Sequence, residues 1–259
     1  MTSLNPLLDL SARPIIAHRG ASGWAPENTM AAFELAVRQG ADAFELDVRL
    51  TGDGVPVVLH DAALDRTTDT AGPLAGLSLE QLRRVDAGAR FSPDGGRAFP
   101  YKSTGIGIPP LVEVLRTFPE MPVLIEIKEV AAQEAVRQVL IEERAVERCV
   151  LASEQEPALE LFREPPFTRG ASGREISALY WATMLWRTAP ASGYRLLSVP
   201  DRYRGLTVPT RRFVAAAARM GCPVHVWTVN HPTTAQRLWA RGVAGIVTNV
   251  PDQIKTARG

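Results

Sequence analysis

The chain has 259 residues, a formal net charge of +1 and a hydrophobic fraction of 46%. The length matches a single α/β barrel of about 250 residues, and the hydrophobic fraction is that of a globular protein with a sizeable core. A nearly neutral chain generates no whole-protein field that would attract nucleic acid, so we expect no nucleic-acid partner.

The two cysteines, Cys149 and Cys222, lie in or beside apolar runs and are predicted to be reduced, buried thiols. Two cysteines in a chain of this size do not make a disulfide scaffold. The first residues lack the basic start and apolar run of a secretory signal. No stretch of about 18 apolar residues is present, so no transmembrane segment is predicted. We therefore expect a cytoplasmic protein.

Short apolar runs alternate with helical patterns along the chain. The runs predict strands at 15–17, 44–50, 55–60, 123–128, 149–152, 176–179, 196–199, 224–229 and 245–248. Helices are predicted from residue 30 to a stop at Gly40, with Asn28 or Thr29 as the cap, and at about 129–143, 210–220 and 232–241. This alternation is typical of βαβ units in a mainly parallel sheet of the α/β class.

Nine predicted strands exceed the eight parallel positions of a barrel. The Asp53-Gly54 pair between two apolar runs is a strong signal for a tight hairpin turn. We therefore predict that 44–50 and 55–60 pair antiparallel, as an addition to a single barrel domain that covers residues 14–259.

Residues 61 to about 110 interrupt the alternation with many glycines and prolines and one short helix signal, at 78–84. A segment this long is expected to have local order of its own. We predict a small inserted lobe on the barrel mouth, in which residues 72–110 shape the specificity of the site.

The first candidate site residue is His18, which follows the strand at 15–17 and so lies at a C-terminal strand end, the active face of a barrel. Arg19 beside it offers a forked donor to a phosphate, and Gly20 permits close approach of the backbone. On its own, a His-Arg-Gly triplet is a weak signal for catalysis.

Glu45 and Asp47 are a stronger signal. They are two residues apart on a predicted strand and face one side, whereas Phe44, Leu46 and Val48 face the other. Two neighbouring acids on a buried strand repel each other unless a cation holds them, and carboxylate oxygens are the ligands of Mg²⁺ and Ca²⁺. The alternative is a solvated strand face.

The predicted hairpin adds His60. With a two-residue turn containing Asp53, His60 lies opposite Asp47 or Glu45, depending on which neighbour of Asp53 completes the turn. Either register puts the imidazole on the face that carries the acids. A three-residue loop would put it on the other face.

A third acid, Glu126, shares a strand face with Lys128, while Ile125 and Ile127 face the core. An acid and a lysine within an apolar strand are expected to point into a polar barrel mouth, where Lys128 can pair with a phosphate or with the metal ligands. A structural ion pair is the alternative.

The strand at 224–229 carries His225 and Trp227 on one face. Trp227, at the strand end, either lines a substrate wall or packs in the core. His225, which comes earlier in the strand, is assigned a structural role, and His231 is assigned to the surface.

Together these residues suit phosphodiester hydrolysis. That reaction needs charge neutralisation at the phosphoryl oxygens, a general base for the nucleophile and a general acid for the leaving oxygen. One divalent cation on the three acids, together with Arg19 and Lys128, supplies the first. Histidine titrates near neutral pH, and His18 as base and His60 as acid supply the other two.

Several motifs, in order along the chain, resemble the glycerophosphodiester phosphodiesterase family. They extend from about residue 14 to 254 and are far more specific as an ordered series than singly. They are His18-Arg19-Gly20, Pro26-Glu27-Asn28-Thr29, Glu45-Leu46-Asp47-Val48, Asp53-Gly54, Val57-Val58-Leu59-His60-Asp61, Leu64-Asp65-Arg66-Thr67-Thr68, Ile108-Pro109, Glu126-Ile127-Lys128, Trp227-Thr228-Val229-Asn230, Gly242-Val243 and Thr248-Asn249.

The resemblance implies a (β/α)₈ TIM-type barrel with a small insertion, and hydrolysis of glycerophosphodiesters to sn-glycerol 3-phosphate and an alcohol. It implies one divalent metal ion, Mg²⁺ or Ca²⁺, and a small-molecule substrate. The positions it matches are the metal ligands Glu45, Asp47 and Glu126, the acid–base pair His18 and His60, and the substrate contacts Arg19, Lys128 and Trp227.

The alternative function is that of a lysophospholipase D-type phosphodiesterase, with the same catalytic residues and a groove for an acyl chain. The alcohol moiety and the oligomeric state are left open. Asn249 stands where many family members have Asp, and residues 170–204, with several aromatic side chains, match no family motif. We expect an amphipathic barrel helix in that segment, and contact with a lipid or an alcohol moiety is the alternative.

Overall fold

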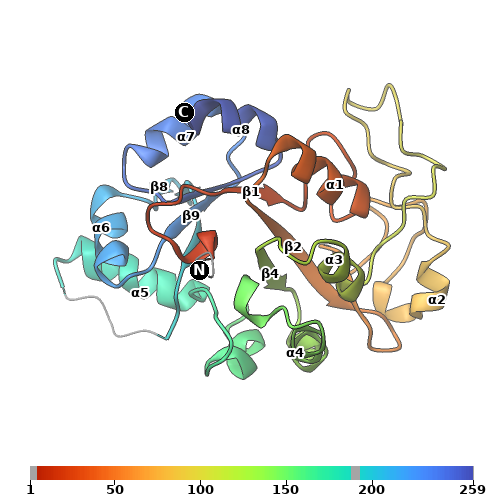
Figure 1. The fold of residues 1–259 in the computed structure, drawn as a ribbon, viewed down its shortest axis with the longest axis horizontal. Coiled ribbons are helices and arrows are strands. Elements are labelled where there is room, and N and C mark those ends of the chain that lie inside the picture. The colour runs from red at the N-terminus through yellow and green to blue at the C-terminus, as the bar shows by residue number, and fades with distance from the viewer. Residues whose placement is uncertain (1–4, 188–192, 259) are drawn as a thin grey trace.

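The structure, a computed structural model, describes residues 5–187 and 193–258. Parallel strands curl into a barrel with helices around the outside (Figure 1). The sheet order is β5-β4-β2-β1-β10-β9-β6, with β3 paired to β2. The strands are β1 Ile15–His18, β2 Ala43–Leu50, β3 Pro56–Val58, β4 Val123–Ile127, β5 Cys149–Ala152, β6 Leu197–Pro200, β7 Arg202–Tyr203, β8 Leu206–Thr207, β9 Val224–Trp227 and β10 Gly245–Thr248.

Helices lie at each of the four ranges where the sequence predicts one after a strand, whereas the helices at 111–117 and 251–258 were not predicted. Thr29 caps α1 and Gly40, with φ of 77°, ends it, while Thr210 caps α6. The α-helices are α1 Met30–Gln39, α2 Leu79–Leu82, α3 Leu111–Thr117, α4 Gln133–Glu142, α5 Gly173–Met184, α6 Arg211–Arg219, α7 Pro232–Trp239 and α8 Pro251–Arg258. The 3₁₀ turns are η1 Pro6–Leu8, η2 Leu74–Gly76, η3 Val130–Ala132, η4 Val146–Arg148 and η5 Glu156–Phe162.

The gap between β5 and β6 is bridged by a short stretch, residues 168–171. Gly170 N donates to Leu151 O at 2.8 Å, and Ala171 N donates to Leu196 O at 2.9 Å. Both bridges, Leu151 with Arg169 and Gly170 with Leu196, are parallel. This stretch therefore occupies the eighth position of the barrel, and the expected α/β barrel fold is confirmed.

The predicted strand at 176–179 is wrong, because these residues belong to α5. Ser172 and Glu175 form a capping box that starts the helix. Ile176 and Leu179, spaced by three, then face the neighbouring core. A segment of four mostly apolar residues is compatible with the period of a helix and with that of a strand. Here the capping box indicates a helix. The expected amphipathic helix in this segment is confirmed.

Side chains alternate between the outside and the inside of the barrel. Phe44, Leu46 and Val48 pack outward in the main core against the helices. The floor of the barrel is filled by Leu7, from η1, which packs with inward residues of the strands such as Ile16. In Figure 1 this N-terminal segment lies across the middle of the ring. The inward positions nearer the C-terminal strand ends are thus left for polar side chains.

His225 has a structural role, as expected. Its side chain is fully buried, and its Nε2 donates to Leu7 O at 2.8 Å. A Cβ on Gly245 would lie 2.2 Å from the His225 Nδ1, so the imidazole packs directly on the glycine backbone. The ring thereby ties the N-terminal segment to β9 and β10.

The hairpin forms, but the predicted two-residue turn is wrong. Leu50 pairs with Pro56, so five residues make the loop. Thr51 Oγ1 bonds Asp53 Oδ1 at 2.6 Å and accepts from Val55 N at 2.9 Å, which closes this wider loop. The register argument for His60 therefore does not hold. His60 reaches the barrel mouth because β3 ends at Val58 and the chain turns there.

Residues 61–110 connect β3 to α3 and contain η2 and α2. The predicted capping box of Ser78 and Gln81 is present at the start of α2. Buried side chains of this segment, including Leu74 and Leu82, form one small core together with Val57 and Leu59. The segment is thus packed onto β3 and its extension. No helix in the described ranges is long and apolar enough to cross a bilayer.

Candidate active site

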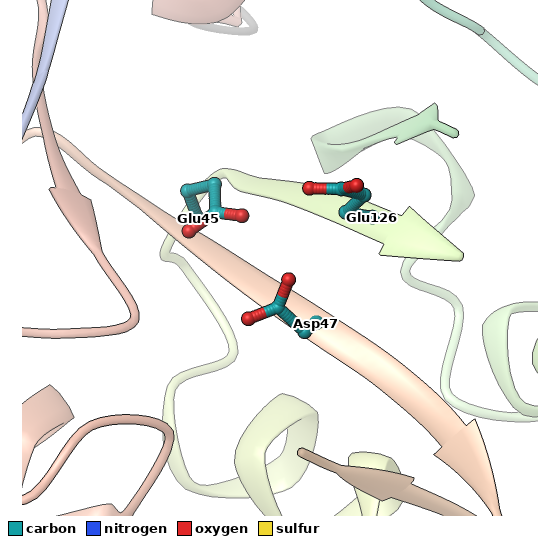
Figure 2. A group of neighbouring side chains, drawn as sticks. All are labelled: Glu45, Asp47 and Glu126. Carbon is teal, nitrogen blue, oxygen red and sulfur yellow. The ribbon is translucent and has the colours of Figure 1, made fainter. Parts of the chain in front are cut away.

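Three carboxylates meet at the C-terminal mouth of the barrel. Glu45 and Asp47 come from β2 and Glu126 from β4, and the parallel register sets Asp47 beside Glu126. One ligand atom of each lies within 4.8 Å of the others. Figure 2 shows the three carboxylates turned toward a common space between the two strands. Asp47 is fully buried and Glu45 is 6% exposed, so the cluster is held largely out of water.

Two cationic side chains partly neutralise this cluster. The Lys128 ammonium lies 2.9 Å from Asp47 Oδ1 and 2.7 Å from Glu126 Oε1. The Arg19 guanidinium lies 3.0 Å from Asp47 Oδ2. Asp47 is therefore paired on both oxygens, whereas Glu45 has no such partner at comparable distance among the described residues.

The pKa values of the three carboxyl groups reflect this unequal pairing with cations. Burial, and then the charges of Asp47 and Glu126, raise the pKa of Glu45 well above its ordinary value. Burial also raises the pKa of Glu126. For Asp47 burial acts in the same direction, but Arg19 and Lys128 outweigh it and the pKa is lowered. The ionised form of Glu45 is therefore disfavoured in the cluster as it stands, and a cation bound between the three carboxylates would favour it.

The backbone after β1 positions Arg19. Arg19 has φ of 58° and Gly20 has φ of 80°. A Cβ on Gly20 would lie 2.6 Å from the Ala32 backbone, so only glycine lets this turn pack onto α1. The Arg19 amide donates to Glu45 Oε2 at 3.1 Å. The turn thereby carries the guanidinium over the carboxylates.

His18 is held by Asn249 rather than by an acid. Its Nδ1 lies 2.7 Å from Asn249 Oδ1, and its Nε2 lies 3.9 Å from Glu45 Oε2. An amide oxygen accepts, so Nδ1 carries the proton and Nε2 is left with a lone pair. Burial, and then Arg19, lower the pKa of His18 to about 4. The ring is neutral at neutral pH and is competent to accept a proton.

His60 is held by a carboxylate. Its Nδ1 lies 2.5 Å from Asp61 Oδ1. Burial raises the pKa of Asp61, but bonds from Arg66 and His60 prevail and lower it to about 2. Arg66 also donates to Glu27 Oε2 at 2.8 Å, and Glu27 accepts from Arg19 at 2.9 Å. A continuous chain of ion pairs thus connects the His60 side of the site to Arg19.

Glu27, Asp61 and Arg66 were not among the predicted site residues. All three lie within the family-like motifs, which is the signal that pointed to them. Asn28 has a role of the same kind, because its Nδ2 donates to Asp47 Oδ2 at 2.8 Å. These residues position the groups that face the cavity.

The carboxylates open onto a cavity of about 750 Å³. Its polar side is formed by His18, Arg19, Glu45, His60, Glu126 and Lys128. Its apolar side is formed by Ile176, Tyr180, Trp181, Tyr203, Leu206 and Trp227. Except for Asp47, which lies beneath the surface, all the predicted site residues therefore line one cavity.

The apolar wall comes from α5, the β7–β8 hairpin and Trp227 of β9, not from the inserted segment. Of the described residues that line the cavity, none falls between 61 and 110. The segment lies at the same end of the barrel, where Arg66 reaches Glu27. Residues 72–110 therefore do not line this cavity, where Tyr180 and Trp181 of α5 lie instead, and their influence on specificity stays a prediction.

The fold and the position of these groups define an α/β-barrel enzyme that keeps its reactive side chains at the C-terminal mouth. The family model described as "Glycerophosphoryl diester phosphodiesterase family" matches residues 18–253, and the chain belongs to this family. The expected resemblance and the expected class of enzyme, a phosphoric diester hydrolase, are confirmed.

Individual relatives cover nearly the whole chain. YhdW of Bacillus subtilis is 37% identical over 93% of this chain and 96% of its own length. A glycerophosphodiester phosphodiesterase of Bacillus altitudinis is 32% identical, over 92% of this chain and 95% of its own. A solved phosphodiesterase of Oleispira antarctica, in complex with the product sn-glycerol-3-phosphate, has a TM-score of 0.75 and 27% identity and covers 95% of this chain and 96% of that one.

Proposed function

We propose that the protein hydrolyses glycerophosphodiesters to sn-glycerol 3-phosphate and an alcohol, with one divalent metal ion, Mg²⁺ or Ca²⁺. The observation that carries the proposal is the group of three carboxylates with ligand atoms within 4.8 Å of one another, facing a cavity that also contains Arg19 and Lys128. The product bound to the Oleispira antarctica relative supports the product named here.

The donor set fits a hard divalent cation, and Glu45, Asp47 and Glu126 would hold it. When ionised, these three acids and the two cations Arg19 and Lys128 carry −3 and +2, a sum of −1. A divalent ion brings this sum to +1, and a phosphodiester monoanion then brings it to zero. The bound ion would supply Lewis-acid charge at the phosphoryl oxygens.

The chain's own groups orient the substrate and move protons. We assign Arg19 and Lys128 to the phosphate and Trp227, which is 39% exposed in the cavity wall, to the substrate wall. His18 accepts a proton at Nε2, either from water or from the glycerol hydroxyl next to the phosphate. With water, the oxygen attacks phosphorus as the alcohol leaves and sn-glycerol 3-phosphate forms directly. With the glycerol hydroxyl, its oxygen forms a cyclic phosphodiester as the alcohol leaves, and water must then open that ring to give sn-glycerol 3-phosphate. His60, fixed through Nδ1 by Asp61, donates a proton from Nε2 to the leaving oxygen.

One observation favours a second candidate, a lysophospholipase D-type activity. The apolar side of the cavity, with Tyr180, Trp181 and Leu206, can accommodate part of an acyl chain. The same catalytic groups would serve. Release of choline from lysophosphatidylcholine distinguishes the two substrate classes.

The test is a substrate panel of glycerophosphodiesters and lysophospholipids, with Mg²⁺, with Ca²⁺ and with a chelator. We expect sn-glycerol 3-phosphate to form from glycerophosphodiesters in a metal-dependent reaction that Glu45→Gln and Glu126→Gln abolish. The matched control is Glu80→Gln, a change of an exposed acid on α2. Undiminished turnover after exhaustive chelation would contradict the metal dependence.

We also propose a cytoplasmic location, which the free cysteines support. Cys149 and Cys222 are both buried and unbridged, and reduced thiols are typical of that compartment. Fractionation of cells that express a tagged chain tests this proposal, and recovery outside the cytoplasmic compartment would contradict it.

A further inference from the structure

Large apolar side chains lie exposed beside the cavity mouth. On α5 and just beyond it, Trp181 is 56%, Leu185 58% and Trp186 78% exposed, and on the β7–β8 hairpin Tyr203 is 58% and Leu206 48% exposed. We call residues 181–187 and 202–206 the aromatic rim. Single exposed apolar residues are ordinary, but a cluster of this kind marks an interaction surface.

The two parts of the aromatic rim are adjacent in space. Trp181, Tyr203 and Leu206 line the same cavity. The Arg212 guanidinium lies 3.7 Å from the ring centroid of Trp186, so the end of α5 meets the start of α6. The rim is therefore one surface at the barrel mouth rather than two separated segments.

This surface is also positively charged. Residues 181–187 and 201–212 contain five arginines, Arg187, Arg202, Arg204, Arg211 and Arg212, and one acid, Asp201. All five arginines are exposed. Among the residues that the structure describes, none of the five forms an ion pair, whereas Asp201 is paired with Arg237 at 2.6 Å. The charge of this surface is thus left for an anionic partner.

We propose that the aromatic rim docks the protein on the surface of an anionic lipid bilayer, with the cavity mouth facing the lipid. Tryptophan and tyrosine favour the headgroup region. Exposed leucine and tryptophan side chains add apolar burial at the acyl boundary. Unpaired arginines add attraction to anionic headgroups. Tyrosine, tryptophan and arginine are also common in protein interfaces, and what favours a lipid bilayer is that Trp181, Tyr203 and Leu206 of this surface also line the cavity.

The test is sedimentation of the full chain with phosphatidylcholine vesicles, with and without phosphatidylglycerol. We expect binding to the anionic vesicles that weakens as ionic strength rises. Leu185→Ser with Trp186→Ser should lose most of the binding, and Arg187→Gln and Arg202→Gln should each weaken it about fivefold. Neither Leu185 nor Trp186 lines the cavity, so hydrolysis of a water-soluble diester by that double variant should match the wild type.

The matched control is Arg97→Gln with Phe99→Ser, which changes an exposed arginine and an exposed aromatic residue on the inserted segment. This variant should bind vesicles as the wild type does, and thermal melting checks that each variant is folded. Equal binding by wild type and rim variants, or no binding to anionic vesicles at low salt, overturns the proposal. So does self-association that the rim variant abolishes without any vesicle binding. Vesicle binding needs no substrate, so the result is independent of the proposed function.

Discussion

The two histidines of the site differ in the group that holds each ring. His18 Nδ1 meets the neutral amide of Asn249, whereas His60 Nδ1 meets the ionised Asp61. An amide offers no counter-charge to an imidazolium, but a carboxylate does. This contrast supports His18 as the base and His60 as the acid. It also gives Asn249 a function in fixing the His18 tautomer, despite its departure from the family pattern.

His18→Ala and His60→Ala are each expected to lower kcat at least about a hundredfold, because proton transfer to a leaving alkoxide is typically worth that much. A substrate with a nitrophenyl leaving group should partly restore His60→Ala and not His18→Ala. His231→Ala, a change of an exposed histidine, is the control. Near wild-type turnover of a glycerophosphodiester by both variants would mean that the histidines are structural.

His225 makes stability depend on pH. Burial lowers its pKa from 6.5 to about 4, so the unfolded chain binds a proton between these values and the folded chain does not. Stability is fully present above pH 6.5 and is lost as pH falls toward 4. We expect the free energy of unfolding to drop by about 2 kcal/mol from pH 7 to pH 5 on account of this group. Urea unfolding of His225→Asn should show a shallower pH slope, and an unchanged slope would refute the assignment.

At the scale of elements, η1 closes the barrel floor. Leu7 is fully buried among inward strand residues, although η1 comes before residue 14, where the sequence placed the start of the barrel. Leu7→Ala should therefore cost about 2–5 kcal/mol in denaturant unfolding. Leu10→Ala, at a 45% exposed position, should cost less than about 0.5 kcal/mol. Similar small effects at both positions would contradict the role of Leu7 in filling the floor of the barrel.

The β9–β10 contact depends on a missing side chain. Gly245 leaves room for the His225 ring, and a Cβ there would overlap it at 2.2 Å. Gly245→Ala must displace the ring from Leu7 O and should destabilise the protein by about 1–3 kcal/mol. Thermal melting measures this cost. Gly95→Ala is a useful contrast: a Cβ there meets nothing within 4 Å, so only its left-handed φ of 73° opposes the change. Gly245 has no positive φ, so a loss there no larger than the loss at Gly95 would contradict the packing explanation.

At the scale of the whole molecule, we propose that residues 14–259 unfold as one unit with 61–110 as an insertion, since the insertion shares its core with Val57 and Leu59. A metal ion that binds only the folded chain adds about 2.7 kcal/mol to the free energy of unfolding when its free concentration is a hundred times its Kd. Calorimetry should show one transition, raised by about 5–10 °C with saturating Mg²⁺ or Ca²⁺. Glu45→Gln should abolish the rise. Two separate transitions, or no response to metal, would contradict these proposals.

Much of this architecture could be read from the sequence, because barrel strands are continuous apolar runs that stand out between helices. The acids on β2 and β4 were found because strand alternation fixes which residues share a face. The five-residue hairpin loop was missed, since a loop with an odd number of residues reverses the facing of His60 relative to the predicted two-residue turn and leaves no local signal. The wall formed by Tyr203 and Leu206 was missed because their strands are two residues long, too short for a periodic pattern to predict.

The short bridge at 168–171 gives the barrel a seam. All other neighbouring strands of the barrel are hydrogen-bonded directly to each other. By contrast, β5 and β6 are connected only through backbone bonds to these few residues. The amides of Gly170 and Ala171 should therefore exchange with solvent sooner than those of β1 and β10, where local opening requires more bonds to break at once. We therefore expect the barrel to open first between β5 and β6, which separates the side with the carboxylate-bearing strands from the side with the aromatic rim. A chain cut within 163–167 is accordingly the natural place to look for two fragments that reassemble into one enzyme.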